Sequence, residues 1–290
     1  MAKSFRANRI NPDKFHRSQL GFYCILVPLC FIMLIPIVFT FSQAFKTLGE
    51  LYQFPPTIIV QRPTLDNFRM LFAAGNLSVI PISRYVVNSI IVSTSTVVLA
   101  LLMTVTGGYV LSKKKYPIIG TLFKVNQFAL MFVPIAVMIP RYLLVSQIGI
   151  MDTYWAHILP MLAMPVAMFL MKQFIDQIPD VLIEAAKIDG AGDFYIVRKI
   201  IIPLSKPALA TVGILTFQLV WADTTTSSLF ITDEVLRTIS HFFAAVSSNN
   251  AVAAAGISAA AGLVLFLPNL IIFIFMQSKV MSTMSHSGIK

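Results

Sequence analysis

Polar and aromatic side chains interrupt the long apolar stretches of this chain, at positions where they could contact a polar solute. Amide, carboxylate and hydroxyl groups exchange hydrogen bonds with such a solute, and an aromatic face covers its apolar parts. Hydrogen bonding between neighbouring helices explains each of these side chains equally well. The candidates for solute contact are Asn88, Asn126, Gln127, Gln218, Trp221, Asp223 and Thr225.

A second group of residues lies in one polar segment, where small and charged side chains favour docking to another protein over catalysis. Pro179 and Asp180 predict a helix start, with Asp180 as the N-cap that accepts free backbone N–H groups. The helix runs to about Ile188 and ends where a glycine tolerates the left-handed conformation. Packing of this segment against the ends of its own bundle is the alternative. The candidate docking residues are Glu184, Ala185, Ala186, Asp189, Gly190 and Ala191.

A second short helix is predicted over 193–201, which completes a hairpin. Phe194, Val197 and Ile201 fall on one side at spacings of three and four, with Arg198 and Lys199 turned away. Pro203 and Pro207 end this helix and begin the next apolar stretch.

Motifs for catalysis and for metal or nucleotide binding are absent from the sequence. No Gly-x-x-x-x-Gly-Lys-Ser/Thr phosphate loop occurs, because Gly107 and Gly108 precede Lys113 at the wrong spacing. The four histidines are scattered, and Cys24 and Cys30 lie six apart in one helix, so no metal or disulfide framework is expected. We therefore expect a non-catalytic chain that binds no cofactor of its own. His157 is interpreted as an interfacial residue.

Composition dictates the elements that must position these residues. With 57% hydrophobic and 12% charged residues in 290, the chain is predicted to be an all-α integral membrane protein. Crossing a ~30 Å hydrocarbon core takes about 20 apolar residues per helix. The predicted spans are 20–45, 84–111, 116–144, 154–171, 208–226 and 252–276.

The distribution of Lys and Arg orients the predicted bundle. Most of the 22 basic residues fall at the N-terminus, after the second span, between the fourth and fifth spans, and after the last. Since such residues accumulate in cytoplasmic loops, both termini are expected to be cytoplasmic. The net charge of +10 is then explained by topology and anionic lipid headgroups, and nucleic-acid binding is not expected. The basic residues left on the outer side are Lys46, Arg62, Arg69, Arg84, Arg141 and Arg237.

The predicted organisation is a single transmembrane domain over 20–276 between a cytoplasmic segment 1–19 and a cytoplasmic tail 277–290. An external loop (46–83) and the cytoplasmic docking loop (172–207) belong to that domain, and Thr64 to Phe68 suggest a short helix start in the former. Prolines in the third and fourth spans predict bends. Gly107, Gly108, Gly213 and the small residues of 251–262 predict close helix packing.

The docking segment resembles the signature loop of the membrane subunits of ATP-binding-cassette (ABC) importers. That pattern reads Glu-Ala-Ala, two residues, Asp-Gly-Ala, a spacer and Ile-x-Leu-Pro-x-x-x-Pro. Ile202 stands where Leu is commoner. The residues in register are Glu184, Ala185, Ala186, Asp189, Gly190, Ala191, Ile200, Pro203, Leu204 and Pro207.

The chain is also similar to the carbohydrate-uptake branch of that family, of the type of the smaller maltose-importer permease. Phe217, Trp221 and the Ala- and Gly-rich last span carry this likeness. Ala222, Asp223 and three threonines follow Trp221 where the branch has Asn and an acidic or aromatic pair. This departure leaves the identity of the sugar open.

The resemblance implies a six-helix type I permease fold in the bacterial inner membrane, with a coupling helix from Glu184 to about Gly190. It implies that this helix sits in a cleft of an ATPase subunit, with Glu184 paired to a basic residue there. The implied partners are two ATPase subunits that bind ATP and Mg²⁺, a second homologous permease in a heterodimer, an extracytoplasmic solute-binding protein and a sugar or oligosaccharide. The alternatives are an ABC permease for a non-sugar solute, a gradient-driven secondary transporter and an intramembrane enzyme.

Overall fold

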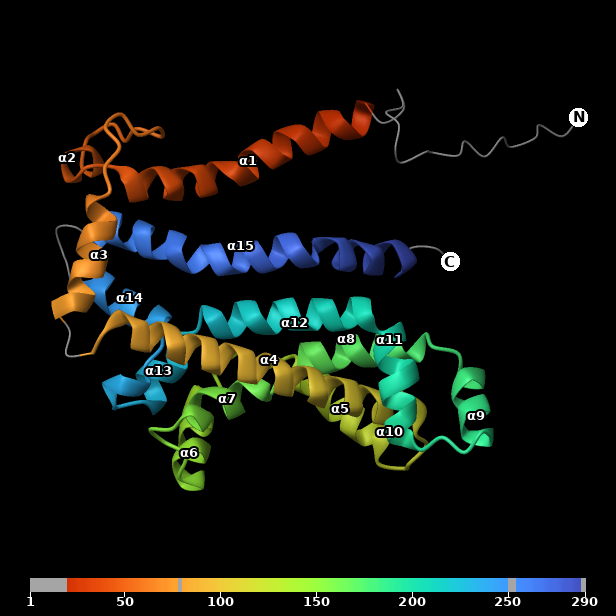
Figure 1. Ribbon diagram of the computed structural model, residues 1–290. Helices are drawn as coiled ribbons and strands as arrows, with labels where there is room; N and C mark the ends of the chain where they lie inside the picture. The colour runs from red at the N-terminus through yellow and green to blue at the C-terminus, as the bar shows by residue number, and fades with distance from the viewer. Residues whose placement is uncertain (1–19, 78–79, 250–253, 288–290) are drawn as a thin grey trace, which may run out of the picture.

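Four long helices form the body of the molecule and lie side by side in Figure 1. Helix α1 (Leu20–Phe45) packs along α15 (Ala254–Ser287), which packs on α12 (Lys206–Trp221). Helix α12 in turn packs on α4 (Ile82–Lys113). All regular secondary structure in the described part of the chain is helical. The computed structural model describes residues 20–77, 80–249 and 254–287.

The two ends of the body carry different short elements. Helices α9 (Asp180–Ile188) and α10 (Asp193–Ile196) lie at one end, together with the start of α1 and the end of α15 (Figure 1). Helices α3 (Asp66–Leu77) and α14 (Ile239–Asn249) lie at the other end, beside α2 (Leu48–Leu51). Both helices nearest the termini therefore reach the end that carries α9, as the predicted topology requires. Residues 1–19 and 288–290 of the predicted terminal segments lie outside the described residues.

Three predicted spans correspond to continuous helices. The first coincides with α1, the second is α4 extended slightly at both ends, and the sixth is the apolar part Ala255–Gln277 of α15. Helix α15 continues to Ser287, so the predicted tail 277–290 is helical over most of its length. The predicted start of the sixth span, Val252, is not among the described residues.

The third predicted span, in which the prolines predicted a bend, is interrupted completely and not merely bent. Its residues form α5 (Ile119–Ala129) and α6 (Met138–Ile148), separated by a non-helical stretch over 130–137 that contains Pro134. Proline removes a helical hydrogen bond and clashes with the preceding turn, which accounts for the break.

The fourth and fifth spans are also discontinuous. Helices α7 (Tyr154–Leu162) and α8 (Pro165–Asp176) meet at 49°, as the prolines predicted. Helix α12 ends at Trp221, and α13 (Thr225–Phe230) follows it. Within the described ranges, three helices are long and apolar enough to cross a membrane, or up to five if each bent pair is one span. The predicted number of six spans remains a prediction.

Glycines bring α4 close to α8, as the sequence predicted. A Cβ on Gly107 would lie 2.6 Å from Cε of Met168, and one on Gly108 would lie 3.0 Å from Cγ of Met171. A Cβ on Gly213 would make only ordinary contact with Leu101, at 3.9 Å. Gly107 and Gly108 thus set the spacing of the α4–α8 pair.

The predicted external loop is built around two buried charged residues. Lys46 donates a hydrogen bond to the carbonyl of Thr57. Glu50 accepts one from the backbone N–H of Gln61 at 2.7 Å. Asn67, also buried, donates to the carbonyls of Ala44 and Lys46, both at 2.9 Å, and so joins α3 to the end of α1.

Gly256 of α15 packs directly against this Asn67 junction, which makes it a test of the fold. A Cβ there would lie 2.4 Å from Oδ1 of Asn67, and the amide is held by its two carbonyl partners. Overpacking costs about 1–3 kcal/mol, against a helix-propensity gain of about 1 kcal/mol for Ala over Gly. We expect Gly256→Ala to lower the thermal unfolding midpoint in detergent.

Gly262→Ala provides the control for this prediction, because nothing lies within 4 Å of its Cβ position. This variant is expected to keep or raise the unfolding midpoint. Equal midpoints for the two variants would show that the α3–α15 contact is absent in the membrane protein.

Candidate functional site

The docking hairpin begins with α9, whose C-terminus has the conformation that its glycine predicted. Gly190 has a φ of 82°, and its N–H donates to the carbonyl of Lys187 at 3.0 Å. The N–H of Ala191 donates to the carbonyl of Ala186 at 2.9 Å. These are the two bonds of a Schellman motif, which ends a helix with a glycine in the left-handed region.

The predicted capping role of Asp180 is wrong. Pro179 occupies the N-cap position and has no side-chain cap hydrogen bond, and Asp180 is the first residue of α9. Its carboxylate instead accepts a hydrogen bond from Nζ of Lys113 at 2.8 Å, since that lysine projects from the end of α4. The hydrogen bond and charge of Lys113 hold the pKa of Asp180 below its usual value.

The second arm of the hairpin differs from the predicted amphipathic helix. After α10 the backbone widens into a π-helical turn, η2 (Val197–Ile201), and then α11 (Ile202–Leu204). Ile196 and Ile201 are fully buried at a spacing of five, whereas Phe194, predicted to share a face with Ile201, is 79% exposed. Arg198 and Lys199 are exposed as predicted, and the π turn, which changes the helical period between Phe194 and Ile201, explains why only Phe194 was misplaced.

Buried isoleucines attach the hairpin to the body. Ile183 of α9 lies in one hydrophobic cluster with Ile196 and Ile201, and Met171 and Val212 belong to the same cluster. Apolar burial of this kind is the main source of stabilisation for a short helix. Helix α9 is therefore fixed relative to α8 and α12.

Polar contacts join the same hairpin to the end of α4. Lys113, whose side chain is only 6% exposed, also donates to the carbonyl of Ile178 at 2.6 Å. Lys114 donates to both carboxylate oxygens of Asp193 at 2.8 and 2.6 Å, and Tyr109 donates to the same carboxylate at 2.8 Å. We call Tyr109, Lys113, Lys114, Asp180 and Asp193 the ionic clasp.

The outward face of the hairpin is available to a partner. Glu184 and Ala185 are exposed, and the carboxylate of Glu184 has no hydrogen-bond or ion-pair partner among the described residues. Ile188 is 86% exposed and lies beside the turn at Gly190. In Figure 1, α9 stands apart from the four long helices. Exposed apolar residues on a rigid element are typical of protein-binding surfaces.

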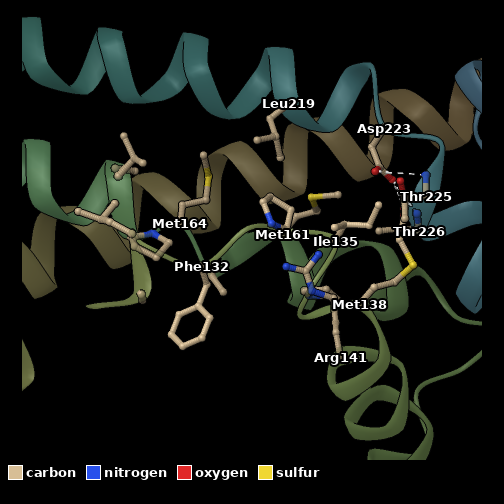
Figure 2. Close-up of a pocket in the computed structure, with 18 of the residues that line it drawn as sticks. Phe132, Ile135, Met138, Arg141, Met161, Met164, Leu219, Asp223, Thr225 and Thr226 are labelled. Carbon is tan, nitrogen blue, oxygen red and sulfur yellow. Dashed lines mark hydrogen bonds between the residues drawn. The ribbon is translucent and has the colours of Figure 1, made fainter. Parts of the chain in front are cut away.

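A cavity of about 750 Å³ lies in the body, where three discontinuities of the predicted spans meet. The stretch between α5 and α6, the bend between α7 and α8, and the junction of α12 with α13 all contribute to its wall (Figure 2). Non-helical backbone at membrane depth is tolerated where it is buried in protein or lines a cavity. The wall is mostly apolar, and its charged residues are Arg141 and Asp223.

The structure brings only part of the predicted solute-contact set to this cavity. Asp223 and Thr225 line it. Asn126 lies nearby and donates to the carbonyl of Pro165 at 3.1 Å, which ties α5 to the bend before α8. Gln127 and Gln218 are exposed and do not line the cavity.

Two members of the predicted set have structural hydrogen bonds instead. Asn88 is fully buried and donates to the carbonyls of Val235 and Arg237 at 2.7 and 3.0 Å, while it accepts from Tyr154 at 2.8 Å. Trp221 donates through its indole N–H to the carbonyl of Leu265 at 3.1 Å and so joins α12 to α15. Neither side chain lines the cavity.

Sequence reasoning missed several functional positions. Arg141 was interpreted only as an outer-side charge, although its position near the end of a predicted span was the available signal. His157, interpreted as interfacial, is fully buried and bonds Thr226 Oγ1 at 2.9 Å and the carbonyl of Leu236 at 3.1 Å. The lysines at the end of α4 were interpreted as topology signals, yet Lys113 and Lys114 hold the hairpin.

Comparisons with known proteins agree with this geometry. Residues 85–278 match the family model of the binding-protein-dependent transport system inner membrane component. The inner membrane ABC transporter permease protein YcjP of Escherichia coli (strain K12) is 30% identical over 94% of this chain and 97% of its own length. The polygalacturonan/rhamnogalacturonan transport system permease protein YtcP of Bacillus subtilis (strain 168) is 28% identical over 73% of this chain and 71% of its own length.

A solved structure has the same fold. It is a bacterial ABC transporter involved in the import of the acidic polysaccharide alginate, and one of its chains superposes with a TM-score of 0.70. The superposition covers 91% of this chain and 98% of that chain at 22% identity. The match over 85–278, which contains the hairpin and the cavity, shows that this chain belongs to the inner membrane components of binding-protein-dependent transport systems, the permease subunits of ABC importers.

Proposed function

We propose that this permease forms half of a pathway for a sugar or oligosaccharide, and that it couples transport to ATP hydrolysis in separate ATPase subunits. The observation that carries this proposal is the hairpin, which exposes Glu184 and Ile188 while its buried face and the ionic clasp hold it to the body. Such an element can transmit the movement of a partner protein outside the membrane to the membrane helices. The carbohydrate class is supported by the similarity to YtcP, a polygalacturonan/rhamnogalacturonan transport system permease protein, and by Phe217, Trp221 and the Ala- and Gly-rich last span.

The partners follow from the position of the hairpin. We propose that α9 sits in a cleft of one of two ATPase subunits, which bind ATP and Mg²⁺, with Glu184 paired to a basic residue there. Hence the end that carries α9, and both termini, face the cytoplasm. A solute-binding protein docks at the opposite end, near α3 and α14, and a second homologous permease completes the pathway as a heterodimer.

Motion of α9 has two routes into the membrane. Through η2 and α11 the hairpin continues into α12, with a bend of 83°. Through the ionic clasp it pulls on α4, which packs against both α8 and α12. Rigid-body movement is transmitted by stiff, packed elements with discrete arrangements.

The proposal is tested by uptake of labelled oligosaccharides into vesicles that contain the full complex and its solute-binding protein. We expect uptake to require ATP on the side of the membrane where the ATPase subunits lie. Uptake should persist when an ionophore dissipates ion gradients. Uptake that survives ATP depletion but stops with the ionophore would support a gradient-driven transporter and refute the coupling role of α9.

Gly190 and Glu184 give a direct test of docking. Gly190→Ala places a Cβ at a φ of 82°, which costs about 1–2 kcal/mol and distorts the end of α9. Glu184→Lys reverses a charge with no partner within the described chain. We expect both variants to reach the membrane but to transport little solute per ATP hydrolysed. Gly192→Ala is the control, because Gly192 has an ordinary φ of −73° and an open Cβ position.

Reversal of the ionic clasp tests the route through α4. Lys114→Glu places a carboxylate beside Asp193, which lies 2.6 Å from Nζ in the present structure, so the hairpin should separate from α4 and transport should fall severalfold. The double variant Lys114→Glu with Asp193→Lys restores opposite charges and should recover much of the activity. Lys124→Glu, at an exposed position of α5, controls for loss of positive charge. Equal transport by all of these variants would contradict the α4 route.

A further inference from the structure

Arg141 is the cationic residue in the wall of the cavity, and its surroundings do not neutralise it. It projects from α6, and in Figure 2 its guanidinium extends into the space bounded by Phe132, Met138 and Met161. Among the residues that the structure describes, none forms a hydrogen bond or an ion pair with the guanidinium of Arg141, whose backbone N–H donates to the carbonyl of Val137 at 3.0 Å. The lysines of the ionic clasp, by contrast, each have a carboxylate partner.

The carboxylate of Asp223, the acidic residue of the same wall, is hydrogen-bonded to groups other than Arg141. Its carboxylate accepts hydrogen bonds from the backbone N–H groups of Thr225 and Thr226 at 3.3 and 2.9 Å. The hydroxyl of Thr226 donates a further bond to it. These donors belong to the start of α13, so Asp223 holds the α12–α13 junction and forms no ion pair with Arg141 in the described chain.

A guanidinium in the wall of a cavity needs a ligand or water to accept hydrogen bonds from its donors. Ionisable side chains inside membrane proteins are rare, face cavities, and mark the paths of substrates and ions. Guanidinium groups bind carboxylate and phosphate through two parallel hydrogen bonds, which neutral hydroxyls cannot match in strength. The free donors of Arg141 are therefore suited to an anionic group.

The cavity also has room for the rest of such a molecule. Its volume of about 750 Å³ lies within the range of about 300–1,000 Å³ that is usual for ligand sites. Its other walls include Ile135, Met164 and Leu219, which suit the C–H faces of a saccharide better than they suit a free inorganic ion.

We infer that Arg141 is a specificity-determining residue that binds the carboxylate or phosphate of an acidic saccharide or polyol inside the permease. This inference rests on the proposed function and narrows its cargo to anionic molecules. An acidic side chain of the second permease that neutralised Arg141 would be the competing explanation.

The inference is tested by ligand-induced thermal stabilisation of the purified full complex without the solute-binding protein. The probes are a uronate disaccharide, a neutral disaccharide of the same size and glycerol phosphate. Wild type should be stabilised by at least one of the two acidic probes and not by the neutral one, and which acid acts distinguishes carboxylate from phosphate. The stabilisation should weaken as salt is added.

Variants assign this effect to Arg141. Arg141→Gln should bind the effective acid about 10- to 100-fold more weakly, as expected for loss of hydrogen bonds to a charged group. Arg141→Lys should retain part of the affinity. Arg84→Gln should retain all of it, because the Arg84 guanidinium is exposed and has no hydrogen-bond or ion-pair partner in the described chain. The unfolding midpoints without ligand show whether each variant is folded.

Three outcomes would overturn the inference. These are no stabilisation of wild type by either acid, equal stabilisation by the neutral sugar, and unchanged acid binding in Arg141→Gln. A fall in the ligand-free midpoint of Arg141→Gln with no acid effect in wild type would indicate an ion pair with the second permease. ATP-dependent uptake of a neutral sugar alone would leave the proposed function intact while refuting the role of Arg141.

Discussion

Backbone hydrogen bonding at the three helix breaks is the constraint on which the centre of this molecule depends. A peptide group without a partner costs several kcal/mol in a lipid environment, so breaks must be enclosed by protein. Asn126 supplies a donor to the carbonyl of Pro165, and Asp223 supplies acceptors for the first N–H groups of α13. The N–H of Asp152 donates to the carbonyl of Phe230 at 3.1 Å. Side chains thus supply partners to backbone groups beside two of the breaks, and residues of all three breaks line one cavity.

The hairpin follows a different physical rule, since it lies beyond the apolar body. Its stability comes from one buried face and from charged contacts at an exposed edge, where a single ion pair contributes little. Lys113 and Lys114 act together with the buried Ile183 and Ile196, so the charges orient an element that burial already holds. Orientation, rather than added stability, is what a docking element requires of these pairs.

Local sequence signals predicted the parts of the fold that depend on local interactions. The end of α1 at Phe45 and the left-handed turn at Gly190 follow from hydropathy and from one glycine, and both are confirmed. Pro134 predicted a bend in 116–144, but the long apolar pattern concealed that the helix stops there completely. In 193–201 the burial of Ile201 was predicted correctly, whereas Phe194 was misplaced because the π turn between them changes the helical period.

Long-range partners explain why the candidate site was only partly predicted. Asp223 and Thr225 reach the cavity, but the ionic clasp joins residues that are more than sixty positions apart in the chain. Trp221 and Asn88 were predicted to contact the solute, but their polar groups instead donate hydrogen bonds to distant backbone carbonyls. A single sequence shows which side chains can form hydrogen bonds and leaves open where their partners lie.

Methionine side chains make the wall of the cavity adaptable in shape. Met138, Met161 and Met164 are unbranched thioethers, which change conformation at low energetic cost and fit irregular shapes. The apolar wall can therefore adapt to bound molecules of different length or branching without displacement of a helix. Discrimination between molecules of similar shape would then depend on the polar groups of the wall and on contacts outside this chain.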